Sequence, residues 1–279
     1  MARLRSAASD EEGGRMRIGG STAVVTGAAG GLGSAIARAL HERGALLVLT
    51  GRRQDALDSL ASQVGQARVI VCDLADRTQA DALADQVSDA DIVVANAALP
   101  ATGKLVDFTP NDIDRALEVN LRVPILMTRQ LLPGLLERGR GHLVYISSIA
   151  GKLPTARLSV YAATKFGLRG FSASLRQDLA GTGVSSSVVF PGSITDAGML
   201  ADNGLPAAPR TKGLLAADVG RAVVEAIEQD KAEIDVAERM VRIPARIGGV
   251  APGLMAKATQ RPDSIQCADR LAEGLGHLR

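Results

Sequence analysis

Tyr161 and Lys165 stand four residues apart in a stretch, 159–178, that has good helix formers and no proline. Residues four apart share one face of an α-helix, so the spacing predicts that the phenol and the ammonium are neighbours. A tyrosine ordinarily loses its proton near pH ~10, and a nearby positive charge favours the phenolate and lowers this pKa. The pair therefore predicts an acid–base group suited to neutral pH. An ordinary pair on a helix surface is the alternative, and the rest of the chain decides between the two.

The composition is that of a globular protein with an aliphatic core. The chain has 279 residues, enough for one large domain or two small ones, and 46% of them are hydrophobic. Only 2% are aromatic and none is tryptophan, which favours aliphatic helices packed on a parallel sheet. A net charge of +2 indicates no particular class of partner. Basic residues do not alternate with aromatic ones, so no nucleic-acid partner is expected.

The remaining global signals predict a cytoplasmic protein. Cys72 and Cys267 match no metal-binding or redox spacing, so we expect two reduced thiols and no metal. Residues 1–15 carry few large apolar side chains and are predicted to be a disordered tail without a signal peptide. No apolar run approaches the about 18 residues that a membrane span requires.

A glycine-rich turn lies between the first predicted strand, 22–26, and a helix that begins near residue 34. Its sequence is Thr-Gly-Ala-Ala-Gly-Gly-Leu-Gly over 26–33. Glycines allow positive φ angles and close approach of the backbone to a ligand, and the start of the helix offers free amides to a pyrophosphate. The pattern is typical of a dinucleotide-binding fold, although many such turns join a strand to a helix without any ligand.

Strands and helices then alternate, which predicts a doubly wound α/β fold with a parallel sheet of about seven strands flanked by helices. Further strands are predicted at 45–50, 67–71, 91–95, 141–147, 184–190 and 232–237, with helices near 53–64, 77–88 and 112–132.

Two arginines follow the second strand, where NAD-binding folds often carry an acid for the ribose 2′-hydroxyl. Here the chain reads Thr50-Gly51-Arg52-Arg53. A guanidinium suits a 2′-phosphate by charge and by its fork of donors, so NADP(H) is favoured over NAD(H). Both arginines could instead be solvated at the start of the next helix.

Polar residues lie where the later predicted strands end. Asn96 follows the fourth strand, Ser148 the fifth and Pro191 the sixth, and Tyr161 comes soon after Ser148. Ligands of open α/β sheets bind beyond the carboxyl ends of the strands, so these residues are candidates for one site. Asn120 lies in the predicted helix 112–132, where an exposed surface position is the alternative.

Taken together, these motifs resemble the short-chain dehydrogenase/reductase family. The agreement runs from about residue 20 to residue 237. It comprises Thr26, Gly27, Gly31 and Gly33, then Asp73, Asn96-Ala97, Asn120, Ser148 at 13 residues before Tyr161, Lys165 and Pro191-Gly192.

The resemblance implies an enzyme that interconverts a carbonyl and an alcohol with NAD(P). Tyr161 would exchange a proton with the substrate oxygen, Ser148 would bond that oxygen, Lys165 would lower the tyrosine pKa and hold the nicotinamide ribose, and Asn120 would keep a water linking Lys165 to solvent. Asp73 would bond the adenine. The residues expected at the cofactor are Gly27, Ala29, Gly31, Leu32, Gly33, Arg52, Arg53, Asp73, Leu74, Asn96, Ala97, Tyr161, Lys165, Pro191, Gly192 and Ile194.

The sequence departs from the family pattern in two places. Ala98 stands where relatives often have glycine, and the glycine pair usual after the seventh strand is missing. The second departure puts in doubt the C-terminal contact that makes many relatives tetramers. The family's pairing of helices near 112–136 and 160–180 still implies a homodimer at least, helped by small residues at Ala162, Ala163, Gly167, Gly170 and Ala173.

Two segments bear on the substrate. The loop 193–215 carries Met199, Leu200 and Leu205, which could line an apolar pocket or only pack the loop down. Residues 239–279 form a helical extension, broken by prolines at 244, 252 and 262, in which basic and apolar residues interleave. We expect it to cover the substrate cleft or contact another subunit, with a membrane surface as the less favoured partner.

The sequence thus predicts a tail over 1–15, a catalytic Rossmann-fold domain over 16–238 and an extension over 239–279. Its expected activity is that of an NADP(H)-dependent oxidoreductase acting on a small, apolar carbonyl or alcohol. An NAD-linked alcohol dehydrogenase of the same fold, or a non-catalytic nucleotide sensor, is the alternative.

Overall fold

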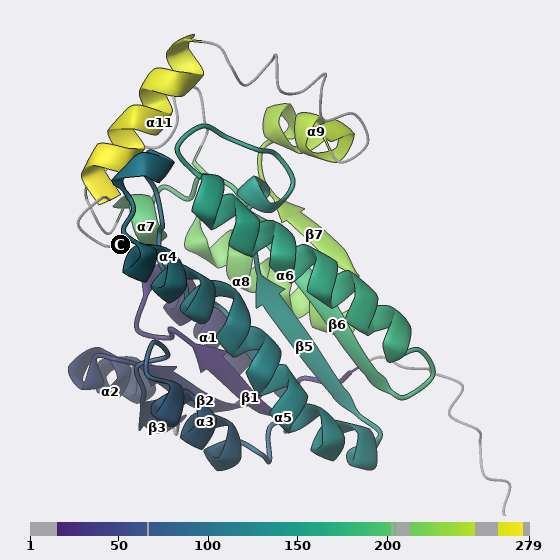
Figure 1. The fold of residues 1–279 in the computed structure, drawn as a ribbon. Helices are drawn as coiled ribbons and strands as arrows, with labels where there is room; N and C mark the ends of the chain where they lie inside the picture. The colour runs from purple at the N-terminus through teal and green to yellow at the C-terminus, as the bar shows by residue number, and fades with distance from the viewer. Residues whose placement is uncertain (1–15, 66, 202–203, 205–212, 249–261, 276–279) are drawn as a thin grey trace, which may run out of the picture.

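The computed structural model describes residues 16–65, 67–201, 204, 213–248 and 262–275. Its centre is one parallel sheet of seven strands in the order β3-β2-β1-β4-β5-β6-β7, with helices on both faces (Figure 1). The predicted doubly wound α/β fold is confirmed. The strands are β1 Thr22–Thr26, β2 Leu46–Gly51, β3 Ala67–Val71, β4 Ile92–Ala95, β5 Gly141–Ile146, β6 Val184–Pro191 and β7 Glu233–Val236.

Two apolar layers hold helices against the sheet. Successive strand residues point to opposite faces, so Val25 of β1 joins one layer and Val24 the other. The Val25 layer is covered by α1 (Gly31–Glu42), α2 (Gln54–Gln63) and α8 (Ala216–Glu228). The Val24 layer is covered by α3 (Arg77–Gln86), α5 (Val123–Arg138) and α6 (Ser159–Asp178). Burial on both faces explains why the strands read as continuous apolar runs.

The predicted helix 112–132 is interrupted, which corrects the sequence interpretation. It consists of α4 (Pro110–Leu117), a π-turn η2 (Glu118–Arg122) and α5. The backbone N–H of Val123 donates to the Glu118 carbonyl, five residues back, as a π-turn requires. Pro124 follows directly and has no N–H, so it cannot make the α-helical bond to the Asn120 carbonyl. The wider turn therefore falls on Asn120.

Shorter elements complete the described chain. They are the turns η1 (Leu105–Asp107) and η3 (Ile149–Gly151) and the helices α7 (Gly198–Ala201), α9 (Arg239–Gly248) and α11 (Pro262–Leu275). The extension is helical as predicted, but Pro244 lies inside α9 and does not end it, whereas Pro262 opens α11. The tail 1–15, Leu205 and Pro252 lie outside the described residues. Within those ranges, no helix has both the length and the apolar character needed to cross a membrane.

Candidate active site

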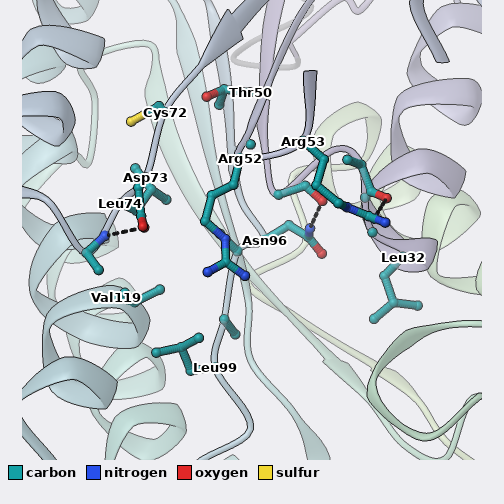
Figure 2. Close-up of a pocket in the computed structure, with 18 of the residues that line it drawn as sticks. Leu32, Thr50, Arg52, Arg53, Cys72, Asp73, Leu74, Asn96, Leu99 and Val119 are labelled. Carbon is teal, nitrogen blue, oxygen red and sulfur yellow. Dashed lines mark hydrogen bonds between the residues drawn. The ribbon is translucent and has the colours of Figure 1, made fainter. Parts of the chain in front are cut away.

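A cavity of about 480 Å³ opens at the carboxyl ends of β1 to β4 (Figure 2). It contains most of the residues that the sequence assigned to a cofactor. Those that line it are Gly27, Ala29, Gly31, Leu32, Gly33, Arg52, Arg53, Asp73, Leu74, Asn96 and Ala97. They come from four separate βα junctions, which a parallel sheet brings to one edge.

Hydrogen bonds from Asn96, which follows β4, hold the glycine-rich turn in shape. Gly27 has a φ of 65°, a conformation that favours glycine. Asn96 Nδ2 donates to the carbonyls of Thr26 at 2.9 Å and Gly27 at 3.3 Å. The Thr26 hydroxyl in turn accepts the backbone amides of Asn96 and Ala97 at 3.0 and 3.1 Å. Asn96 therefore fixes the turn, and the first amides of α1 are left to face the cavity.

Gly33 packs directly on this turn, and a methyl group there is expected to damage the site. A Cβ at Gly33 would overlap the Gly27 carbonyl oxygen and approach the Ala28 Cα to 2.8 Å, both backbone atoms. We expect Gly33→Ala to weaken NADPH binding by about tenfold in titration calorimetry, about 1.4 kcal/mol. Gly30→Ala is the matched control, because Gly30 has a φ of −84° and its Cβ would be 3.4 Å from the nearest atom. Equal affinity in both variants would contradict the assignment of the turn.

The two arginines after β2 differ in position. Arg53 Nη2 donates to the Ala29 carbonyl at 2.7 Å, which ties α2 to the glycine-rich turn. The Arg52 side chain points into the cavity (Figure 2). Asp73 follows the neighbouring strand β3 and also lines the cavity, where its carboxylate accepts the Ala75 amide at 3.0 Å. Of the two arginines after β2, Arg52 is thus the one presented to a ligand, and Arg53 supports the turn.

Arg115 and Cys72 are among the lining residues that the sequence did not predict. Arg115 of α4 borders the cavity, and nothing in its helix marks it as facing a ligand. Cys72, at the end of β3, also lines it. Burial, with a smaller contribution from the charge of Asp73, raises the pKa of the Cys72 thiol to about 11, so the thiol is neutral.

Tyr161, Ser148 and Lys165 come together beside this cavity. The side chains of Tyr161 and Ser148 share a hydrogen bond. Lys165 is buried, with Nζ 5.5 Å from the centre of the Tyr161 ring and 2.9 Å from the Ile146 carbonyl, to which it donates. The predicted shared helix face is present, since both residues lie in α6.

The predicted fall in the tyrosine pKa does not occur. Burial raises the pKa of Tyr161 to about 12, and the bond with Ser148 offsets only part of this rise. Burial likewise lowers the pKa of Lys165 to about 7. A low-dielectric environment disfavours the charged form of each group. At neutral pH Tyr161 is therefore a phenol, which can donate a proton.

The buried lysine predicts a pH-dependent stability. The Lys165 pKa is about 7 in the folded protein and about 10.5 when unfolded, so between these values the unfolded chain binds more protons. Above the unfolded pKa the amine is neutral in both states, so its burial then costs the least stability. The free energy of unfolding should therefore rise from pH 7 upward, by up to about 1.4 kcal/mol per pH unit. The free energy of unfolding is measured with denaturant at several pH values for the parent and for Lys165→Met. The difference between the two proteins should rise with pH at this slope, and a difference that does not change with pH would contradict the lowered pKa.

The turn after β5 sets the direction of the serine. The Ser148 hydroxyl accepts the Ala150 amide at 3.2 Å and so caps η3. The neighbouring Ser147 hydroxyl donates to the Lys165 carbonyl at 2.9 Å. Gly151 closes the turn against α6, where a Cβ would lie 2.5 Å from Ser147 Oγ. Strand end, turn and helix are thus packed as one unit around the reactive side chains.

Asn120 is buried and not the exposed alternative considered from sequence. Its Oδ1 accepts the Leu99 amide at 2.7 Å, and its Nδ2 donates to the Leu99 carbonyl at 2.9 Å and to the Thr164 hydroxyl at 3.4 Å. Asn120 therefore joins the loop after β4 to α6, one residue before Lys165. π-Turns are frequent at functional sites, and this one places the asparagine.

Five predicted cofactor residues do not line the described cavity: Tyr161 and Lys165, which lie together in α6, and Pro191, Gly192 and Ile194. Pro191 ends β6, the Gly192 amide donates to the Val236 carbonyl at 2.9 Å, and Ile194 is buried beside Leu214. They lie at the same sheet edge, farther along it. Met199 and Leu200 were expected either to line an apolar pocket or to pack the loop down, and their side chains are not among those described.

Comparison with known proteins finds one family for most of this chain. The family model described as short chain dehydrogenase matches residues 21–205. Ketoacyl reductase HetN of Nostoc sp. is 35% identical over 84% of this chain and 86% of its own length. An uncharacterized oxidoreductase of Staphylococcus aureus is 35% identical over 79% of this chain and 96% of its own.

Solved structures share the fold of this chain. A metagenomic short-chain oxidoreductase in complex with NADP has 32% identity and a TM-score of 0.68, covering 79% of this chain and 98% of that one. A short-chain dehydrogenase from Sphingobium yanoikuyae in complex with NADPH shares the fold, with a TM-score of 0.75 at 22% identity over 85% of this chain and 95% of that one. The chain therefore belongs to the short-chain dehydrogenase/reductase family and is an NAD(P)-dependent oxidoreductase.

Proposed function

We propose that the protein uses NADP(H) to interconvert a carbonyl and an alcohol, with Tyr161 as the acid–base residue. One observation carries the proposal: the Tyr161 hydroxyl, bonded to Ser148 and one helical turn from the buried Lys165, lies at the sheet edge that holds the cavity. Proton donor, oxygen-binding hydroxyl and nucleotide-sized cavity are the parts that such a reaction needs.

The cavity fits a dinucleotide by its own chemistry. The start of α1 offers amides and a positive dipole end for a diphosphate, and Gly33 lets the helix pack closely on the glycine-rich turn. Asp73 and Leu74 would flank the adenine, and Arg52 would meet a 2′-phosphate. When bound, the nicotinamide supplies or accepts the hydride.

The residues around Tyr161 would handle the proton. As a neutral phenol, Tyr161 carries the proton that it would donate to a carbonyl oxygen during reduction. Ser148 would donate a hydrogen bond to the same oxygen as negative charge develops. Lys165 would hold the nicotinamide ribose, and Asn120, at its π-turn, would order a water that resupplies the proton.

An apolar carbonyl compound is the substrate class we propose. Beside Tyr161, a small apolar cluster contains the buried Ala101 and Val160 and the partly buried Phe108 and Ile113. Such surroundings would accept an apolar body next to the reactive oxygen. The similar Nostoc protein carries the name of a ketoacyl reductase, which fits a carbonyl substrate of this kind.

Turnover with a panel of carbonyl and alcohol compounds tests the proposal, with NADPH and NADH compared by the absorbance of the reduced nicotinamide. We expect reduction of apolar carbonyls with NADPH. Activity with NADH alone would support the NAD-linked alternative. Tight nucleotide binding without turnover of any compound would support the non-catalytic sensor.

We also propose a homodimer through α4, α5 and α6. The outer sides of these helices expose Leu117, Leu136 and Phe166, at 37%, 40% and 36%. Light scattering at micromolar concentration should give at least twice the mass of one chain. A mass of one chain would contradict this arrangement.

The small residues predicted to serve that contact divide into two groups. Ala162 is buried within the chain, and a Cβ at Gly167 would meet Leu121 at 3.0 Å. Ala163 and Ala173 are exposed, and a Cβ at Gly170 would meet nothing within 4 Å. Only the second group is available to approach another helix.

A further inference from the structure

Lys152 is a buried ammonium that the proposed reaction does not use. It follows η3 as its C-terminal cap residue, and its side chain is 4% exposed. Its Nζ lies 2.5 Å from Asp235 Oδ1 and 2.8 Å from Glu233 Oε2, both on β7. The same atom lies 3.9 Å from the centre of the Phe190 ring. Lysines are almost never buried unless they are paired, and here the two carboxylates of β7 provide the pairing.

Arg169 of α6 adds a second cation, which balances the two carboxylates of β7. Its Nε and Nη2 donate to the two Glu233 oxygens at 2.6 and 3.2 Å, and its guanidinium lies 5.8 Å from the Phe190 ring. Burial raises the pKa of Glu233, but the bonds from Arg169 and Lys152 outweigh this and keep the pKa below its usual value. Two cations and two carboxylates thus surround one aromatic ring. We call Lys152, Arg169, Phe190, Glu233 and Asp235 the Lys152 cluster.

The Lys152 cluster joins three segments that carry candidate site residues. On the β5 side, η3 is capped by the Ser148 hydroxyl, and the Lys152 amide donates to the Ile149 carbonyl at 3.0 Å. On β6, Phe190 directly precedes Pro191 and pairs in register with Asp235 of β7. On α6, Arg169 lies one turn beyond Lys165. In Figure 1, α6 runs over β6 beside β7, where these segments meet.

We infer that Lys152 is a positioning residue for the reaction: its ion pair with β7 anchors η3 and thereby aims the Ser148 hydroxyl at Tyr161. An ion pair with hydrogen-bond geometry fixes direction as well as distance, which an apolar side chain packed on Phe190 would not. The inference rests on the proposed function, because it assigns Ser148 the part of binding the substrate oxygen.

The test compares Lys152→Met with the parent enzyme. Methionine has an unbranched side chain one atom shorter than that of lysine and carries no charge. We expect kcat to fall by about tenfold or more while the Kd for NADPH changes by less than about twofold, since only the transition-state interaction of Ser148 is disturbed. Lys152→Arg, which keeps the charge, should recover part of kcat.

Arg176→Met is the matched control. Arg176 also lies on α6 and forms an ion pair, at 2.7 Å, with Asp230 just before β7, but at the opposite edge of the sheet from the site. It should lower the melting temperature and leave kcat unchanged. Because Lys152→Met leaves Asp235 buried without its lysine, Lys152→Met with Asp235→Asn is measured too. This double variant should regain stability and keep a low kcat.

Three outcomes would overturn the inference: an unchanged kcat in Lys152→Met, an equal kcat loss in Arg176→Met, or full recovery of kcat in the double variant. Hydrogen exchange of residues 148–152 separates this result from a failure of the proposed function, because it needs no turnover. Faster exchange there in Lys152→Met alone supports the anchor even in a protein that reduces nothing. Unchanged exchange in that variant contradicts it.

Discussion

Tyr161→Phe is expected to abolish turnover while leaving NADPH binding nearly intact. The substitution removes one hydroxyl, which in the structure is bonded to Ser148 and protonated at neutral pH. Positioned general acids contribute about 10²- to 10⁴-fold to rate, so kcat should fall by at least about 10²-fold. Steady-state kinetics with NADPH and the best carbonyl substrate, with calorimetry for the Kd, measures both quantities. The ring itself remains to pack against the apolar cluster.

Tyr145→Phe is the matched control, since the chain has two tyrosines. The Tyr145 hydroxyl is buried on β5 and lies 2.7 Å from the Thr128 hydroxyl, away from the cavity. Its loss should cost stability, about 1 kcal/mol, and leave kcat alone. Retention of more than about a tenth of kcat in Tyr161→Phe, a barrier change below about 1.4 kcal/mol, would show that another group transfers the proton.

Gly51→Asp combined with Arg52→Ala is expected to reverse the cofactor preference from NADPH to NADH. Of the two arginines after β2, Arg52 is the one that points into the cavity, and neither Thr50 nor Gly51 offers a charge that would repel a phosphate. A charge-assisted contact contributes about 1.5–3 kcal/mol, so the parent should prefer NADPH by roughly 10- to 150-fold. Arg52→Ala alone should erase most of this preference through KM, with little change in kcat.

The added carboxylate has room at residue 51, because a Cβ at Gly51 would have no atom closer than 3.8 Å. It would bond a 2′-hydroxyl and repel a 2′-phosphate. Arg68→Ala removes a surface arginine that is paired with Asp89, so it controls for the loss of one positive charge. It should change neither the KM for NADPH nor the KM for NADH. Equal affinity of the parent for NADH and NADPH would show that Arg52 is merely solvated.

The fold and parts of the candidate site could be predicted where a short run of consecutive residues carries the pattern. The glycine-rich turn, the aliphatic strands and the arginines after β2 can each be recognised from a few consecutive residues. The parallel topology then brings the carboxyl ends of the strands to one edge of the sheet. The turn from Ser148 to Tyr161 is likewise contiguous. These parts of the prediction agree with the structure.

What could not be predicted depends on burial and on distant partners. The tyrosine pKa was expected to fall because the sequence shows the Tyr161–Lys165 spacing but not the burial that raises it. The π-turn at Asn120 arises where Pro124 removes a helical bond, a local signal that a search for regular helix overlooks. Lys152 and Asp235 are 83 residues apart, and neither suggests the other until β7 has taken its place beside β6.

The most direct test of the account is transfer of deuterium from NADPH labelled at the reactive C4 position to a carbonyl substrate, read by mass spectrometry of the alcohol. With the unmodified protein we expect one deuterium on the carbinol carbon. With Tyr161→Phe the label should stay on the nucleotide. An alcohol formed without the label, or labelled equally well by the Tyr161→Phe variant, would contradict the proposed roles of NADPH and Tyr161.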